Sequence, residues 1–209
     1  MTETTTTRIE QKERTRDALL AAALKLSQAD GFGQVSLRNV AREAGVVPTT
    51  FYRHFTSMDE LGLALVEQSF IPLRTMIRDA QRDPKLFPNL INRSVEILFD
   101  AVKSNRQHFA FVARERTGGS EVVRYAIQRE LELFISELAV SVGRVPGLAS
   151  WSTDDVMLLC GLFVREMVFR AERVIEMPDG RPDLEDELRS KARAALRMMI
   201  LGVENWKST

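Results

Sequence analysis

Six polar side chains lie close together in the sequence, and their chemical types are those that bind nucleic acid. They are Arg38, Thr49, Thr50, Tyr52, Arg53 and His54. Hydroxyl, guanidinium and imidazole groups donate hydrogen bonds to phosphates, and arginine and threonine also reach base edges or the thymine methyl group. The alternative is that these side chains only form the solvated face of a small helical unit. The elements that position them distinguish the two interpretations.

Two short helices, over residues 36–43 and 47–53, are predicted to carry these side chains. Ser36 can accept backbone N–H groups at the start of the first helix. A turn that contains Gly45 follows, and Pro48 suits the first turn of the second helix, where its missing N–H is not needed. Two short helices joined by such a turn predict a helix-turn-helix, whose second helix can enter a major groove. Its small core would consist of Val40, Ala41, Ala44, Val46, Phe51 and Phe55.

The formal net charge of the chain is zero, from 29 basic and 29 acidic residues. DNA-binding domains usually carry a basic surplus, so the total charge seems to argue against DNA. Counting by segment changes this: residues 31–57 hold three arginines and one acid, Glu43, whereas residues 152–190 hold ten acids and five bases. The chain therefore combines a mildly basic helix-turn-helix with an acidic distal part.

The sequence favours neither an enzyme nor a metal site, so we expect no catalytic residues and no cofactor. His54 and His108 are far apart, and Cys160 lies in an apolar helical stretch where packing is the expected role. A single cysteine also suits a reducing compartment. No apolar run reaches the roughly 18 residues of a membrane span, and the first residues, MTETTTT, lack the apolar core of a signal peptide. We therefore expect a cytoplasmic protein with no membrane partner.

The hydrophobic pattern predicts an all-α fold. Apolar residues recur every three or four positions between residues 122 and 142, as on one face of a helix. We expect about nine helices, over residues 11–29, 36–43, 47–53, 57–80, 88–104, 106–116, 120–143, 152–176 and 182–206. The first three would form a DNA-binding head, residues 1–56, and the others a larger helical-bundle body, residues 57–209.

The head resembles the N-terminal signature of TetR-type transcriptional regulators. The resemblance is carried by Gly31-Phe32, by Ser36-Leu37-Arg38-Asn39-Val40-Ala41-Arg42-Glu43-Ala44-Gly45-Val46, by Phe51-Tyr52-Arg53-His54-Phe55 and by Asp59-Glu60-Leu61. It implies a homodimer with a three-helix head and a ligand-binding body. It further implies that Arg38, Thr49 and Thr50 approach bases or nearby backbone, while Tyr52 and His54 hold phosphates. Met58 stands where the family usually has a lysine.

Within that family, the chain is similar to the branch of repressors that controls unsaturated fatty acid synthesis and desaturation. The body adds Phe109, Arg114-Glu115-Arg116, Gly118, Arg129-Glu130 and Phe134-Ile135 to this likeness, which fades beyond residue 145. The resemblance implies a repressor of lipid metabolism genes that responds to a long-chain acyl thioester such as acyl-CoA. The alternative is the same kind of regulator with a different effector, such as a drug or another lipid.

A long acyl chain would require an apolar tunnel between helices, with positive groups at its mouth for the CoA phosphates. The candidates for the tunnel wall are Phe109, Phe111, Phe134, Phe163 and Met167, and the candidates for the mouth are Arg114 and Arg116. The alternatives are that the aromatic residues are simply core, and that Arg114-Glu115-Arg116 forms ion pairs that hold the helices over residues 106–116 and 120–143 together.

The last two long helices are the expected dimer interface, because family members pair them into a four-helix bundle. The candidate residues are Gly161, Leu162, Leu188, Ala192, Ala195, Met199 and Gly202. The alternative is that these residues bury against their own chain. A two-fold dimer would read a palindromic operator on double-stranded DNA, and an effector would act by changing the spacing of the two heads.

Overall fold

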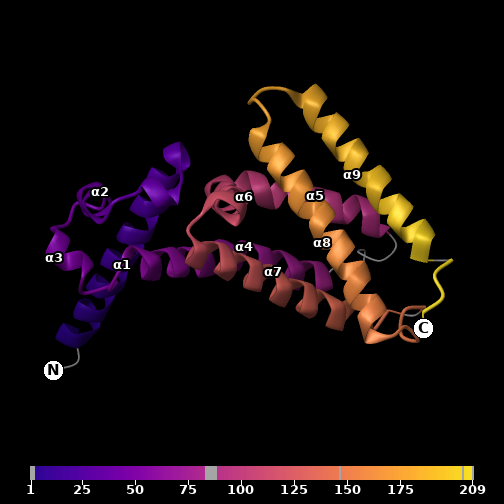
Figure 1. Cartoon of the computed structure of the whole chain (residues 1–209), viewed down its shortest axis with the longest axis horizontal. Helices are drawn as coiled ribbons and strands as arrows, with labels where there is room; N and C mark the ends of the chain where they lie inside the picture. The colour runs from indigo at the N-terminus through magenta and orange to yellow at the C-terminus, as the bar shows by residue number, and fades with distance from the viewer. Residues whose placement is uncertain (1–2, 83–88, 146, 204, 209) are drawn as a thin grey trace. The chain divides into compact units, whose positions relative to one another are not determined.

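The computed structural model describes residues 3–82, 89–145, 147–203 and 205–208. Over these residues the chain forms nine α-helices, one short 3-10 helix and no strand (Figure 1). The all-α prediction is therefore confirmed. None of the described helices has the combination of length and apolar character that a membrane span requires.

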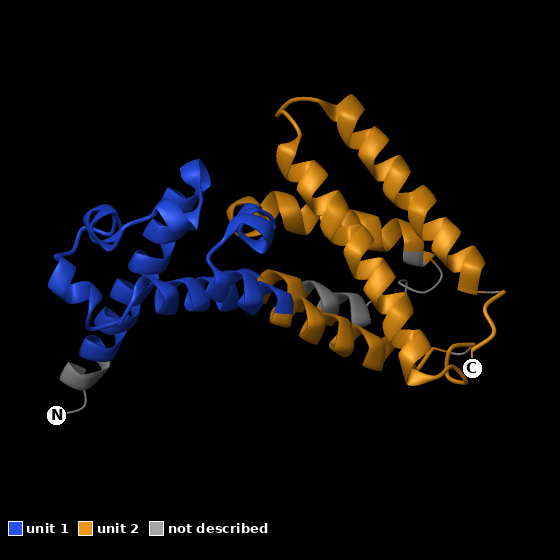
Figure 2. Cartoon of the chain, viewed as in Figure 1, with its two compact units in different colours: residues 1–69, 110–128 blue, residues 70–109, 129–209 orange. Residues whose placement is uncertain are grey.

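The chain groups into two compact units, drawn in different colours in Figure 2. Unit 1 consists of residues 1–69 and 110–128, and unit 2 of residues 70–109 and 129–209. Each unit is described by itself. The division predicted after residue 56 concerns function, DNA binding before it and effector binding after it, and is not a division into compact units. It stays a prediction.

Unit 1 is built around α1 (Glu3–Asp30), which packs against the 3-10 helix η1 (Phe32–Gln34) and against α2 (Leu37–Glu43). The short helix α3 (Pro48–Phe51) packs on α2. Unit 1 also contains the first part of α4 (Met58–Arg82), the last part of α6 (Arg106–Gly118) and the first part of α7 (Glu121–Val142). The large apolar side chains buried in unit 1 include Leu19, Leu20, Phe32, Phe51, Phe55, Leu61, Leu65, Phe111 and Ile127.

Unit 2 is organised by three helices that pack against one another: α5 (Leu90–Ser104), α8 (Thr153–Glu176) and α9 (Pro182–Val203). α8 begins where the Ser152 hydroxyl accepts a 3.3 Å hydrogen bond from the backbone N–H of Asp155, the N-cap arrangement that satisfies a free helix-end donor. The buried apolar residues on these helices include Val95, Phe99, Val102, Cys160, Val164, Met167, Ala192 and Leu196.

An arginine fixes α9 to α5. The guanidinium carbon of Arg189 lies 4.3 Å from the centroid of the Phe99 ring, and the group pairs with Glu96 on α5 and with Glu185 on α9. Glu96 also pairs with Arg193 at 2.7 Å. These contacts join the two helices through charge as well as through apolar packing.

Candidate nucleic-acid interface

Local sequence signals set the turn between α2 and α3. The Ser36 hydroxyl accepts a 3.2 Å hydrogen bond from the Asn39 N–H and so caps α2. Gly45 has a φ of +69°, a left-handed conformation that favours glycine. The turn closes when the Val46 N–H donates to the Ala41 carbonyl at 2.9 Å, and Pro48 then starts α3. The predicted helix-turn-helix is therefore present.

Two buried rings determine which side chains of α3 point outward. Phe51 and Phe55 are buried, with ring centroids 5.7 Å apart. Tyr52, between them in sequence, is 62% exposed. α3 ends at Phe51, and residues 52–54 continue as a turn in which His54 N–H donates to the Phe51 carbonyl at 2.8 Å. Of the six predicted DNA-contacting residues, Arg38, Thr49, Tyr52 and Arg53 are exposed, and Thr50 and His54 are half-buried.

The charge of this surface is positive. The acid of the segment, Glu43, pairs with Lys25 of α1 at 2.6 Å, which leaves the arginines of the helix-turn-helix in excess. Burial lowers the pKa of His54, and the neighbouring charges of Lys12, Arg16 and Arg53 lower it further. Its buried Nδ1 has no hydrogen-bond partner within the described part of the chain. The imidazole is therefore held neutral beside three cations.

Lys12 and Arg16 were missed by the sequence analysis, although α1 supplies them to the surroundings of His54. Their spacing of four residues was the available signal, because residues at i and i+4 share one face of a helix. Nothing local in the sequence shows which face of α1 lies beside α3.

The first turn of α4 is held by reciprocal hydrogen bonds. The Ser57 hydroxyl accepts from the Glu60 N–H at 3.1 Å, and Glu60 Oε2 accepts from the Thr56 N–H at 2.5 Å and from its hydroxyl at 2.6 Å. These bonds from Thr56 lower the pKa of Glu60. Met58 is half-buried in this turn, and its thioether offers no cation to a phosphate.

Two consecutive residues of α6 hold the end of α1. Glu115 is only 2% exposed, and its Oε1 accepts a 2.8 Å hydrogen bond from the Phe32 N–H. Arg114 Nη1 donates to the carbonyls of Ser27, Gln28 and Ala29 at 3.0–3.1 Å. These carbonyls belong to the last turn of α1, where cations are favoured. The alternative prediction was that this triplet forms ion pairs. Arg114 instead binds backbone carbonyl oxygens at the end of α1.

The seven predicted ligand-binding residues are divided between the units. Phe111, Arg114 and Arg116 belong to unit 1, and Phe109, Phe134, Phe163 and Met167 to unit 2. Phe111 packs edge-on against Phe32 with ring centroids 6.0 Å apart. Phe109, Phe134 and Met167 are buried and Phe163 is half-buried. All seven stay predictions for ligand contact.

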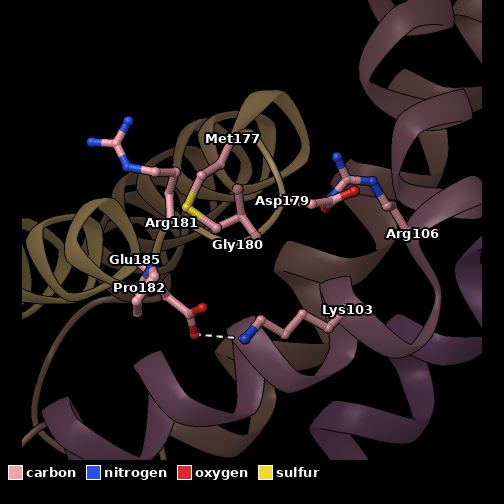
Figure 3. Close-up of a pocket in the computed structure, with 9 residues that line it drawn as sticks. Lys103, Arg106, Met177, Asp179, Gly180, Arg181, Pro182 and Glu185 are labelled. Atoms are coloured by element: carbon pink, nitrogen blue, oxygen red, sulfur yellow. Dashed lines mark hydrogen bonds and ion pairs between the residues drawn. The ribbon is translucent and has the colours of Figure 1, made fainter.

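A pocket of about 450 Å³ lies in unit 2, and Figure 3 shows the side chains around it. It is lined by Lys103, Arg106, Val174, Met177, Asp179, Gly180, Arg181, Pro182 and Glu185. Lys103 from α5 points to Glu185 from α9, and the two form an ion pair of 2.6 Å (Figure 3). Charges of both signs line this pocket, and none of the seven predicted ligand-binding residues does.

The predicted dimer residues differ in exposure within the single chain. Leu162 and Gly202 are exposed, Leu188, Ala195 and Met199 are half-buried, and Gly161 and Ala192 are buried. Large apolar side chains that the sequence analysis did not select are exposed on the same helices: Leu158 and Phe169 on α8, and Met198 and Leu201 on α9. These four side chains offer more accessible apolar surface than Ala192, which its own chain covers completely.

Two side chains of the kinds that can act in catalysis, Cys160 and His108, have pKa values shifted by burial. Burial raises the pKa of the Cys160 thiol to about 11, and burial lowers the pKa of His108. In the part of the chain that the structure describes, no group of three or more His, Cys, Asp or Glu side chains could hold a metal ion.

Residues 19–65 match the family of bacterial regulatory proteins named the tetR family. Solved structures resemble the chain over most of its length. The fatty acid degradation regulator FadR of Bacillus halodurans is 14% identical, with a TM-score of 0.65, and the likeness covers 88% of this chain and 94% of that one. FadR of Bacillus subtilis, in complex with stearoyl-CoA, is 15% identical with a TM-score of 0.66, covering 87% and 96%. The multidrug binding protein EbrR, complexed with imidazole, is 18% identical with a TM-score of 0.61, covering 91% and 89%.

Proposed function

We propose that this chain is a transcriptional regulator of the TetR family, and more specifically a repressor that binds a palindromic operator as a homodimer. The observation that carries the proposal is the surface of α3 and its following turn. There the buried side chains of Phe51 and Phe55 fix the backbone to the core of unit 1, and the side chains of Tyr52 and Arg53 are exposed to solvent. A repressor of this kind acts on chromosomal DNA, so we place it in the cytoplasm.

The six polar side chains divide into two roles by chemistry. Arg38, Thr49 and Thr50 can form hydrogen bonds or methyl contacts with base edges in the major groove, and so they supply sequence discrimination. Tyr52, Arg53 and His54 can hold phosphates, which fixes the register of the helix on the duplex without reading bases. A neutral imidazole still donates one hydrogen bond to a phosphate oxygen.

The proposed dimer forms through α8 and α9. The exposed side chains Leu158, Leu162 and Phe169 follow one another along α8 at helical spacing, and Met198 and Leu201 add apolar surface from α9. Such a surface is covered when a second copy pairs with the first around a two-fold axis. The two heads then address half-sites about 34–36 Å apart, one turn of DNA.

The proposed effector is a long-chain acyl-CoA, and the proposed targets are lipid metabolism genes. The support is the likeness of the chain to the fatty-acid branch of the family and the stearoyl-CoA held by the FadR neighbour. Phe109, Phe134 and Met167 are buried and apolar, as the wall of an acyl-chain tunnel would be. The second candidate is a drug or another lipid, since the EbrR neighbour is named a multidrug binding protein.

The DNA-binding proposal is tested by selection of duplexes from a random library with the full-length protein. Sequencing the retained duplexes should yield a palindrome, and fluorescence anisotropy should show binding to it at about 150 mM salt that a shuffled duplex does not match. Equal affinity for the selected and shuffled duplexes would remove the operator proposal.

The effector proposal is tested separately, on the preformed protein–DNA complex. The complex is titrated with acyl-CoAs of different chain length and saturation, with free CoA as the matched control. A long-chain acyl-CoA should change the operator affinity whereas free CoA should not, because only differential affinity for two states shifts their equilibrium. If no acyl-CoA has an effect, the lipid proposal fails and the DNA-binding proposal stands.

A further inference from the structure

One side of α1 carries a row of positive charges. Arg8, Lys12 and Arg16 recur every four residues and are exposed, so they lie along the same side of the helix. Of the nearby acids, Asp17 lies about 100° around the helix from Arg16, whereas Glu13 precedes Arg16 by three residues and borders the row at that end. The row is therefore a positive strip with one acid at its edge.

The strip meets the turn that follows α3. The guanidinium carbon of Arg16 lies 5.3 Å from the centroid of the Phe55 ring, so the ring supports that charge from one side. Lys12, Arg16 and Arg53 all act electrostatically on His54. Residues from α1 and from the α3 turn thus form one charged surface, although some forty residues separate them in sequence.

Little negative charge balances this surface within the chain. Lys12 and Arg53 form no ion pair with any described residue. Glu60 interacts electrostatically with Arg16 and offsets part of that charge, while its carboxylate also accepts two hydrogen bonds from Thr56. Like charges held together cost free energy until an anion neutralises them. A polyanion that contacts Tyr52 and Arg53 would meet Lys12 and Arg16 as well.

We infer that Lys12 and Arg16 of α1 bind operator phosphates and extend the protein–DNA contact beyond the helix-turn-helix. This inference rests on the proposed function, because it takes the surface of the α3 turn to face DNA. The two cations lie about 6 Å apart along the α1 axis, so they form a second point of attachment to the backbone. They add affinity and orientation but no sequence discrimination, since phosphates are the same in every sequence.

The test compares Lys12→Ala with Arg14→Ala, which removes the same charge from an exposed position outside the strip. The probe is the palindromic duplex that the wild-type protein selects from a random library. Affinity is measured by anisotropy at several salt concentrations between about 50 and 200 mM. Lys12→Ala should weaken binding several-fold and make the slope of log K against log salt shallower by about 0.9, because one fewer counterion is released. Arg14→Ala should keep the wild-type slope.

Arg16 is tested with two variants because its contact with Phe55 gives it a structural role too. Arg16→Ala should make the slope shallower, and Arg16→Lys should restore it while retaining the charge. If Lys12→Ala and Arg16→Ala both keep the wild-type salt slope, the inference is overturned and the proposed function still stands. The same conclusion follows if Arg14→Ala changes the slope as much as Lys12→Ala does. Failure of the wild-type protein to select any duplex would instead overturn the proposed function together with this inference.

Discussion

The carboxylate of Glu115 accepts a 2.8 Å hydrogen bond from the backbone N–H of Phe32, a residue 83 positions earlier in the chain. The bond is buried, and the preceding residue, Arg114, binds three carbonyls at the end of α1. Between these contacts, Gly31 has a φ of +85°, and a Cβ there would lie 3.3 Å from Glu115 Oε1. The end of α6 therefore fixes the turn through which the chain passes from α1 toward the helix-turn-helix.

Replacement of Glu115 by alanine should destabilise the protein. The Phe32 N–H would lose its partner in a buried place, and a cavity would remain, so we expect a loss of about 2–3 kcal/mol in the free energy of unfolding. Urea denaturation followed by circular dichroism measures it. The matched control is Glu67→Ala, an exposed acid of α4 in the same unit, which should change stability by less than about 0.5 kcal/mol. Equal effects of the two changes would contradict the role given to Glu115.

Replacement of Arg189 should weaken the attachment of α9 to α5. Arg189→Ala removes the contact with the Phe99 ring and the ion pairs with Glu96 and Glu185. We expect a loss of about 1–2 kcal/mol in the free energy of unfolding, because the guanidinium is largely shielded from solvent. The loss is limited because Glu96 keeps Arg193 as a partner.

The control for Arg189 is Lys191→Ala on the same helix. Lys191 pairs with Glu187 at 2.5 Å, but both side chains are more than half exposed, and exposed pairs contribute less than about 0.5 kcal/mol. Thermal unfolding of both variants, side by side, gives the comparison. If Lys191→Ala lowers the stability as much as Arg189→Ala does, then neither the shielding of Arg189 nor its contact with Phe99 contributes to the attachment of α9.

Operator affinity should rise as the pH falls from about 7.5 to about 6. In the free protein, burial and the charges of Lys12, Arg16 and Arg53 hold the pKa of His54 below its ordinary value of 6.5. A DNA phosphate adds the opposite charge and raises that pKa, so binding takes up a proton, and affinity gains at most about tenfold per pH unit. His54→Gln should lose the dependence, and His108→Gln, which removes the other histidine, should keep it.

The sign is opposite for the stability of the free protein. With a folded pKa below 6.5, the unfolded chain binds the His54 proton more readily than the folded chain does. The stability associated with a neutral His54 is therefore present above pH 6.5 and is lost as the pH falls through the folded pKa. A measured operator affinity that falls with decreasing pH in the wild type, but not in His54→Gln, would contradict the placement of His54 at a phosphate.

The helix-turn-helix could be predicted from the sequence because its signals act locally. Ser36, Gly45 and Pro48 each determine the backbone of only a few neighbouring residues, and each has the predicted place in the structure. The predicted ends of the helices were less accurate than the predicted turn. α1 begins at Glu3 rather than at residue 11, because residues 3–10 contain neither glycine nor proline and helix propagation adds one hydrogen bond per residue.

Contacts between distant parts of the chain could not be predicted in the same way. The triplet Arg114-Glu115-Arg116 was visible in the sequence, but its partners are 83 or more residues away for Arg114 and Glu115. Likewise, Ala192 was among the predicted dimer residues but is buried against its own chain, whereas Met198 and Leu201 are exposed. Periodicity defines a face of a helix, and only the packed structure shows which face its own unit covers.

The central claim is that α3 and its turn bind the operator, and the most direct test is the affinity of Tyr52→Ala for the palindrome selected by the wild type. Anisotropy at about 150 mM salt should show weaker binding, by about 1–2 kcal/mol for one phosphate hydrogen bond and its ring contacts. The loss should be similar on sequence variants of the operator, because phosphates carry no sequence information. A Tyr52→Ala protein that is folded and keeps the full wild-type affinity would contradict the account.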